Sequence, residues 1–470
     1  MSQDLIRETA RTVVDKLRSG DVSPLELLDA LEKRVAEVDG KVNALPTLCF
    51  DRARANAKAL MQKPAGARGL LAGLPVPIKD LTDVAGVLNT QGSPIFKDNI
   101  PAKSDLMVEN LETNGAVVYA KSNTPEFGAG ANTFNEVFGA TLNPWDTSKS
   151  AAGSSGGAAV ALATGMAWLA QGSDMGGSLR SPAAFCGVVG MRPSIGRVAH
   201  TPKSAIDRNL GVVGPMARNV EDLALLLDAM SGDYADDPLS LPAPATSFLS
   251  ATQAGKKPKR IAYSPDLGIT PVDPEVKAIT RKAAERFAEA GAIVEEAHPD
   301  WREAHECFHV LRAFDFAITK ANLLRTKRDL LKPEVIWNIE EGLKLTVEQA
   351  RARRGAARRH DCTRGGVLQD LRSPAGADDD RAALSDRRPL CRRMRGQEVR
   401  QLRRVARHRL RHHASVLPVA VAALRLHGVR PAGRRPGGGS PPALMHKCSR
   451  ERRFWRIFWA CAARRRLIRR

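Results

Sequence analysis

The fold is decided by two glycine- and serine-rich stretches, Ser148-Lys149-Ser150-Ala151-Ala152-Gly153-Ser154-Ser155-Gly156-Gly157 and Gly172-Ser173-Asp174-Met175-Gly176-Gly177-Ser178-Leu179-Arg180-Ser181-Pro182. A third stretch, Gly73-Leu74-Pro75-Val76-Pro77-Ile78-Lys79-Asp80, carries a lysine at the end of an apolar segment. Segments of this composition are often flexible linkers. Here apolar runs such as Ala161-Leu162-Ala163 separate them, so we interpret them as loops within a folded core.

The chemistry of these loops points to acyl transfer. Glycines let a backbone approach a substrate closely, and free N–H groups can face a developing oxyanion. A nucleophilic serine also needs a base. Residues 1–199 contain no histidine, which leaves Lys79 as a candidate base, although a solvated surface lysine is the structural alternative. A phosphate-binding loop is disfavoured because GxxxxGK[ST] is absent.

Taken together, the three stretches resemble the amidase signature family, in order and in spacing. Lys121–Phe127 and Asn143-Pro144-Trp145 resemble the family's linking segments, and the resemblance covers residues 5–350. Ala152 stands where the family usually has glycine. The resemblance implies an α/β amidase signature fold, with a mixed β-sheet core covered by helices on both sides. Alternating helical and strand patterns over residues 51–62, 117–120, 155–165, 168–171, 220–230, 260–263, 274–290 and 293–296 agree with that class.

The resemblance also implies roles for particular residues. Ser178 resembles the acylated nucleophile, Ser154 the bridging serine on a cis peptide bond, and Lys79 the general base. The backbone N–H groups of Met175, Gly176, Gly177 and Ser178 would form the oxyanion hole. Asp174 and Arg180 resemble a structural ion pair. No metal and no organic cofactor are implied.

The charge of the chain is divided unevenly. Residues 351–470 hold 33 of the 72 Lys and Arg residues and 8 of the 51 Asp and Glu residues. Residues 1–350 therefore hold 39 basic and 43 acidic residues. A basic tail of this kind can bind nucleic acid. This tail, however, has one lysine, no asparagine and no tyrosine. We therefore divide the chain into N-terminal helices (1–64), an amidase signature core (65–350) and an Arg-rich tail (351–470).

We interpret this tail as out of frame and without a native fold. With free choice of synonymous codons, residues 412–438 read one nucleotide later give TTHPSCPSLSLPCGFTASGLPVGVQVV, which resembles the family's C-terminal motifs. The hypothesis is a one-nucleotide frameshift near residues 350–360. On this interpretation the net charge of +21 says nothing about partners, and we expect no nucleic acid.

Several sequence features bear on the class and location of the protein. The seven cysteines form no CxxC pair, the N-terminus lacks an apolar signal segment, and no long apolar run is present in the first half. We therefore expect a cytoplasmic protein without a membrane partner, and we leave open a homodimer.

The resemblance implies hydrolysis of a small carboxamide. Within the family, the sequence looks most like bacterial indole-3-acetamide hydrolases, so the favoured substrate is indole-3-acetamide and the product is indole-3-acetic acid, an auxin. Alternatives are the glutaminase subunit of a tRNA-dependent amidotransferase and a cyclic-amide hydrolase. A nucleic-acid-binding protein that uses the basic tail is the alternative outside enzymology.

Overall fold

The computed structural model describes residues 2–200, 210–349, 352, 422–423 and 457–458. Most of the tail that we interpret as out of frame therefore lies outside the described residues. Its two short strands, β11 (Ala422–Ala423) and β12 (Ile457–Phe458), pair antiparallel.

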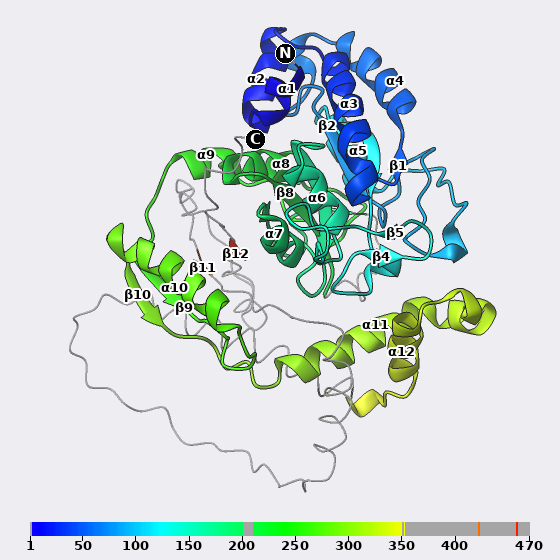
Figure 1. The fold of residues 1–470 in the computed structure, drawn as a ribbon, viewed down its shortest axis with the longest axis vertical. Coiled ribbons are helices and arrows are strands. Elements are labelled where there is room, and N and C mark those ends of the chain that lie inside the picture. Colours follow the sequence, from blue (N-terminus) through cyan, green and yellow to red (C-terminus); the bar gives the residue numbers. More distant parts are fainter. Residues whose placement is uncertain (1, 201–209, 350–351, 353–421, 424–456, 459–470) are drawn as a thin grey trace, which may run out of the picture.

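Four helices form the N-terminal part of the chain, at one end of the molecule in Figure 1: α1 (Ser2–Arg7), α2 (Ala10–Ser19), α3 (Pro24–Val42) and α4 (Phe50–Met61). The start of α3 is encoded locally, because the Ser23 hydroxyl accepts from Glu26 N at 3.2 Å and Glu26 Oε2 accepts from Ser23 N at 2.7 Å. Such a reciprocal cap contributes about 1 kcal/mol. The first residues of the chain form two helices, α1 and α2, because Thr9 caps the start of α2.

The central strands form mixed sheets. β2 (Pro75–Lys79) lies parallel to β3 (Val117–Ser122), whose other edge pairs antiparallel with β1 (Thr47–Leu48). A second sheet has β8 (Val212–Ala217) between β6 (Leu169–Asp174) and β7 (Val189–Gly190). β2 and β6 lie next to each other, so their ends share one region. A short hairpin, β4 (Phe134–Asn135) and β5 (Gly139–Ala140), borders it.

Helices cover these strands. α6 (Gly156–Ala163) packs on β2, β3, β6 and β8, and α8 (Val220–Met230) packs on β6, β7 and β8. The other helices of this part are α5 (Leu106–Thr113), α7 (Arg180–Cys186) and α9 (Phe248–Gln253). Small side chains let α6 lie close to the strands, and seven of its eight residues are buried. The predicted α/β class is confirmed.

Two further units follow α9. β9 (Arg260–Tyr263) and β10 (Ile293–Glu296) pair in parallel and are linked by α10 (Pro274–Glu289), in which no residue is buried. α11 (Ala304–Lys327) and α12 (Pro333–Leu343) pack together at the other end of the molecule (Figure 1). They form a separate apolar cluster whose buried members are Ala129, Phe316, Leu331, Val335 and Ile339.

Candidate active site

Lys79 is the last residue of β2 and is fully buried. Its Nζ donates to three hydroxyls, those of Ser154 at 2.7 Å, Ser155 at 2.9 Å and Ser173 at 3.0 Å. Its backbone N–H donates to Gln171 Oε1 at 2.8 Å on the neighbouring strand β6. The alternative of a solvated surface lysine is therefore wrong.

Burial changes the acid–base behaviour of this amine. Loss of hydration disfavours the ammonium form and lowers the pKa of Lys79 to about 7, against a smaller opposing effect of the Asp174 carboxylate. A lysine of this kind is partly neutral near pH 7 and can accept a proton from a hydroxyl.

The loop that carries Ser154 has an unusual backbone. The Gly153–Ser154 peptide bond is cis, as the resemblance implied. Ala152 has φ of +57°, in the left-handed region, which explains why a glycine is usual at this position. Thr133 Oγ1 fixes the loop by donating to Ala152 O at 2.9 Å and accepting from Gly156 N at 3.1 Å.

A second loop, residues 174–180, is built on a buried carboxylate. Asp174 accepts from Arg180 at 2.9 and 3.0 Å, which is the expected ion pair, and from Arg192 Nη1 at 3.1 Å. Burial alone would raise the pKa of Asp174, but the two guanidinium groups and the Gly177 N–H outweigh it and hold that pKa well below its usual range.

One expected oxyanion donor is already engaged. The Gly177 N–H donates to Asp174 Oδ1 at 2.9 Å, which differs from the expectation that it faces a substrate. No hydrogen bond from the N–H of Met175, Gly176 or Ser178 to another described residue is found. These three remain candidates for the oxyanion hole.

Ser178 lies beside the lysine network and is half-buried. Ser155 N donates to Ser178 O at 3.2 Å, which joins the two loops. Within the described part of the chain, no hydrogen bond joins the hydroxyls of Ser178 and Ser154. The structure therefore brings Lys79 and Ser154 into contact and places Ser178 on the adjoining loop.

Sequence reasoning missed three partners of Lys79. Ser155 follows the predicted bridging serine, and Ser173 and Gln171 are alternate residues of β6. The period of two along a strand places Gln171 and Ser173 on one face, which could have indicated both.

Another buried charge pair lies directly after Lys79. Asp80 and Lys121 are 3.4 Å apart, with side chains 1% and 0% exposed. Thr90 donates to Asp80, and Lys121 Nζ donates to Thr82 O at 2.8 Å and Asn89 Oδ1 at 3.1 Å. The pair anchors the loop that leaves β2.

Two other elements approach the serines. A Cβ on Gly128, where φ is +69°, would lie 3.5 Å from Ser154 Oγ. A Cβ on Gly176 would lie 2.7 Å from the Phe308 ring, so α11 contacts the loop before Ser178. Phe308 is not among the residues that the sequence predicted for the site.

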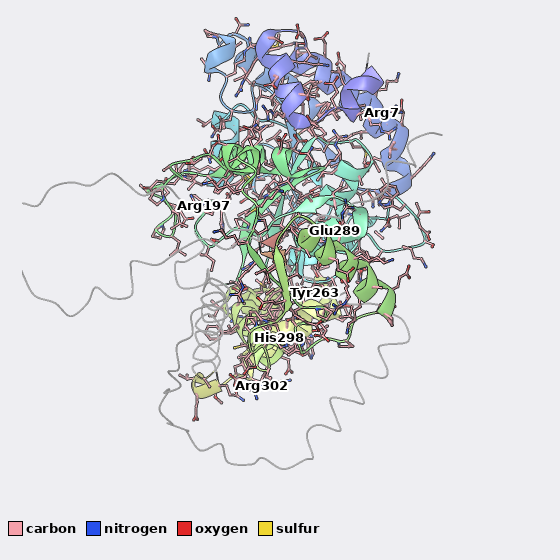
Figure 2. The ribbon with its side chains drawn as sticks, turned by 90° about the vertical axis from the view of Figure 1, so that its left-hand side faces the viewer. Arg7, Arg197, Tyr263, Glu289, His298 and Arg302 are labelled. Carbon is pink, nitrogen blue, oxygen red and sulfur yellow. The ribbon has the colours of Figure 1, made fainter. Side chains whose placement is uncertain are left out.

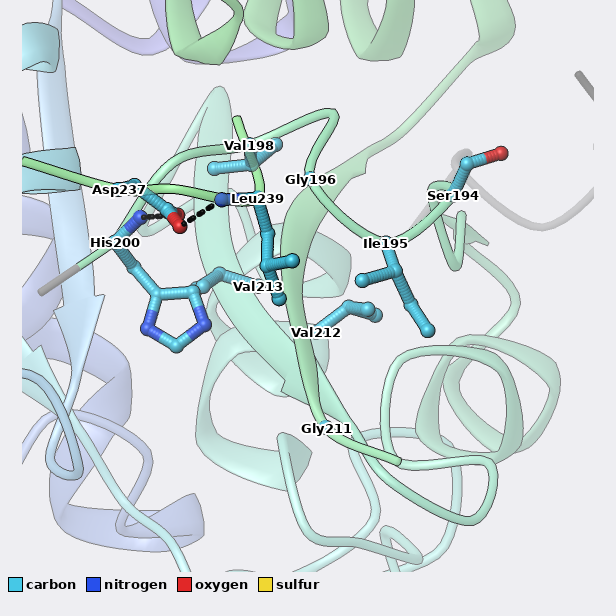
Figure 3. Close-up of a pocket in the computed structure, with 10 residues that line it drawn as sticks. All are labelled: Ser194, Ile195, Gly196, Val198, His200, Gly211, Val212, Val213, Asp237 and Leu239. Atoms are coloured by element: carbon cyan, nitrogen blue, oxygen red, sulfur yellow. Dashed lines mark hydrogen bonds between the residues drawn. The ribbon is translucent and has the colours of Figure 1, made fainter. Parts of the chain in front are cut away.

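A small pocket elsewhere shares no residue with this network. It lies between residues 194–200 and 211–213, where Asp237 accepts from His200 N at 3.2 Å and Leu239 N at 3.0 Å (Figure 3). Among the described residues, no cluster of three or more His, Cys, Asp or Glu side chains is arranged to hold a metal ion. No helix in the described residues is long and apolar enough to span a bilayer.

Comparison with known proteins gives a consistent result. The Amidase family model matches residues 26–362. An acylamidase of Rhodococcus erythropolis is 40% identical over 308 residues, which cover 65% of this chain and 64% of that protein. A glutamyl-tRNA(Gln) amidotransferase subunit from Cyanothece sp. is 38% identical over 323 residues, covering 68% of this chain and 66% of that protein. The chain thus spans slightly less than two thirds of these relatives.

Solved structures show the same similarity. 6-Aminohexanoate cyclic dimer hydrolase, complexed with substrate, superposes with a TM-score of 0.72 at 27% identity, covering 78% of each chain. A bacterial aryl acylamidase of the amidase signature family superposes with a TM-score of 0.71 at 28% identity, covering 77% of this chain and 78% of that one.

Proposed function

Because the chain belongs to the amidase family, whose model matches residues 26–362, we propose that it hydrolyses a small carboxamide to a carboxylic acid and ammonia. The observation that carries the proposal is the 2.7 Å contact between Lys79 Nζ and Ser154 Oγ at a fully buried lysine with a pKa of about 7. A neutral amine beside a hydroxyl, next to a loop with unengaged N–H groups, is suited to activating a serine.

The reaction proceeds through an acyl-enzyme. Ser178 Oγ attacks the amide carbonyl carbon while its proton passes through the Ser154 hydroxyl to Lys79 Nζ. The N–H groups of Met175, Gly176 and Ser178 stabilise the oxyanion. The C–N bond then breaks, and the proton returns through Ser154 to the departing ammonia or amine. Water attacks the acyl-enzyme by the same route and releases the acid and Ser178.

The substrate is a separate part of the proposal. Indole-3-acetamide is the candidate that the sequence favours. The 28% identity to an aryl acylamidase supports N-acyl arylamines as well, and the likeness to a cyclic dimer hydrolase supports a cyclic amide. The 38% identity to a glutamyl-tRNA(Gln) amidotransferase component supports a glutaminase role, which would favour glutamine and would need partner chains. A cytoplasmic location and a homodimer belong to the same proposal.

The test combines labelling with a substrate panel. The full chain, as written and with one nucleotide restored near codons 350–360 as the frameshift hypothesis requires, is treated with a fluorophosphonate and assayed on the four substrate types. We expect the reagent to label Ser178. The label should be absent in Ser178→Ala and retained in the control Ser148→Ala, which changes a serine in an exposed loop. Label on another serine, or no label and no hydrolysis in either form, contradicts the proposal.

The nucleic-acid alternative is tested with the same samples. That alternative would be favoured if the chain had no amidase activity and retarded DNA in a gel in a salt-dependent manner. The retardation should then disappear when residues 351–470 are deleted.

A further inference from the structure

One face of α11 carries four side chains at four-residue spacing, Phe308, Arg312, Phe316 and Lys320. Residues four apart on a helix are neighbours on one face. The contacts confirm the stripe, since the Arg312 guanidinium lies 5.9 Å from the Phe308 ring centre and 5.4 Å from that of Phe316. We call these four residues the α11 stripe.

Both ends of the α11 stripe contact the loops of the candidate active site. Phe308 lies against Gly176, in the loop that leads to Ser178. At the other end, Lys320 Nζ lies 4.3 Å from the centre of the Phe127 ring, and the next residue, Gly128, adjoins Ser154. The stripe therefore spans the site, and Arg312 lies in its middle.

Arg312 has a buried donor without an acceptor. Its Nε is buried and forms no hydrogen bond in the described part of the chain. Burial lowers the pKa of Arg312, and Asp315 partly compensates, but a guanidinium stays charged under ordinary conditions. A buried charged donor without a partner is costly. A ligand that supplied an acceptor would remove that cost.

Charged groups of both signs lie around Arg312. Burial lowers the pKa of Lys332, the carboxylates of Glu334 and Glu126 oppose that effect, and Arg312 adds to it, so Lys332 and Arg312 lie near each other. The oxygens of Glu126 already accept from Ser93 Oγ at 2.6 Å and Lys332 N at 2.9 Å. The inference therefore depends on the position and the unpaired donor of Arg312 and not on an excess of positive charge.

We propose that Arg312 binds a carboxylate of the substrate, so that the preferred amides carry a carboxylate in addition to the scissile bond. A guanidinium can donate two parallel hydrogen bonds to a carboxylate, and the flanking rings hold its plane. This inference rests on the proposed amidase function and narrows its substrate class. It places carboxylate-bearing amides above neutral ones such as indole-3-acetamide, which reverses the order expected from the sequence.

The experiment compares matched substrates in the full chain. Glutaryl 4-nitroanilide is compared with hexanoyl 4-nitroanilide for a carboxylate on the acyl side, and 4-acetamidobenzoate with acetanilide for one on the amine side. In one of the two pairs, the carboxylate member should have at least a tenfold higher kcat/KM. Arg312→Gln should reduce that ratio at least tenfold, mainly through KM, and Arg312→Lys should restore part of it.

Arg302→Gln is the matched control. Arg302, which is labelled in Figure 2, precedes α11. It is 85% exposed and pairs with Asp300. It should leave the ratio unchanged. Raising the salt concentration should lower the ratio in the unmodified chain, which tests the inference without any variant.

Equal kcat/KM within both pairs, or a ratio that neither salt nor Arg312→Gln changes, overturns the inference while amidase activity stands. Absence of hydrolysis of every amide, together with an unlabelled Ser178, instead overturns the proposed function.

Discussion

Replacing Lys79 with methionine should stabilise the fold at neutral and mildly acidic pH. The folded-state pKa of Lys79 is about 7 because the side chain is buried, whereas that of the unfolded chain is near 10.5. This gap corresponds to a cost of about 5 kcal/mol below pH 7, where the folded and the unfolded chain both carry the proton. The variant removes the cost together with the base.

The pH dependence has a defined sign. Between pH 7 and about 10.5 the unfolded chain binds more protons than the folded chain, so the stability of the unmodified protein rises with pH. The cost is complete below pH 7 and absent above about 10.5. From pH 6 to pH 9, the stability advantage of Lys79→Met should therefore shrink by about 3 kcal/mol.

The pH dependence of the stability difference between Lys79→Met and the unmodified protein is a better measure than the size of that difference at one pH. Methionine leaves the hydroxyls of Ser154, Ser155 and Ser173 without their amine partner, which offsets part of the gain by about 1–3 kcal/mol for each group that stays unsatisfied. That offset does not change with pH. Urea denaturation of both proteins at pH 6, 7, 8 and 9 measures the slope, with Lys344→Met at an exposed position as the control. A constant difference between Lys79→Met and the unmodified protein across this range would refute the neutral lysine.

Three further predictions concern the relay, the ion pair and the tail. Lys79→Ala and Ser154→Ala should each lower kcat by several orders of magnitude and the double variant little more, as single-turnover kinetics can show; additive losses would exclude a shared relay. Asp174→Asn should lower the free energy of unfolding by about 3–5 kcal/mol, since it leaves the charges of Arg180 and Arg192 uncompensated, and this loss should shrink below about pH 4, where the unfolded carboxyl binds its proton. Restoring one nucleotide near codons 350–360 should raise the yield of soluble protein and the amidase activity per milligram; equal values for both forms would count against the frameshift.

The parts of the site that the sequence predicted are those joined by local chain patterns. The apolar segment before Lys79 and the glycines beside Ser154 and Ser178 are short-range signals, and the structure places Lys79 and Ser154 in contact. Close packing explains the glycines, since a Cβ on Gly157 would lie 2.3 Å from Asn123 N.

The remaining parts depend on contacts between distant segments. Phe308 contacts Gly176, which lies more than 130 residues earlier in the sequence. The helical periodicity of α11 predicts which residues share a face of the helix, but not which loop that face covers. The engagement of the Gly177 N–H by Asp174 likewise follows from the geometry of one turn rather than from residue types. Long-range packing and local backbone direction are the two features that the residue pattern left open.

The unit β9–α10–β10 has a consequence for motion. No residue of α10 is fully buried, although Val276 and Phe287 are half-buried. Two polar contacts add to this packing: Arg281 pairs with Glu296 at 2.5 Å, and Thr280 Oγ1 lies 3.0 Å from Tyr263 Oη. An isolated helix of its 16 residues is marginal in water. This unit should therefore open without global unfolding, and its amide hydrogens should exchange with deuterium long before those of α6. Salt screens the Arg281–Glu296 pair, so that exchange should accelerate as ionic strength rises.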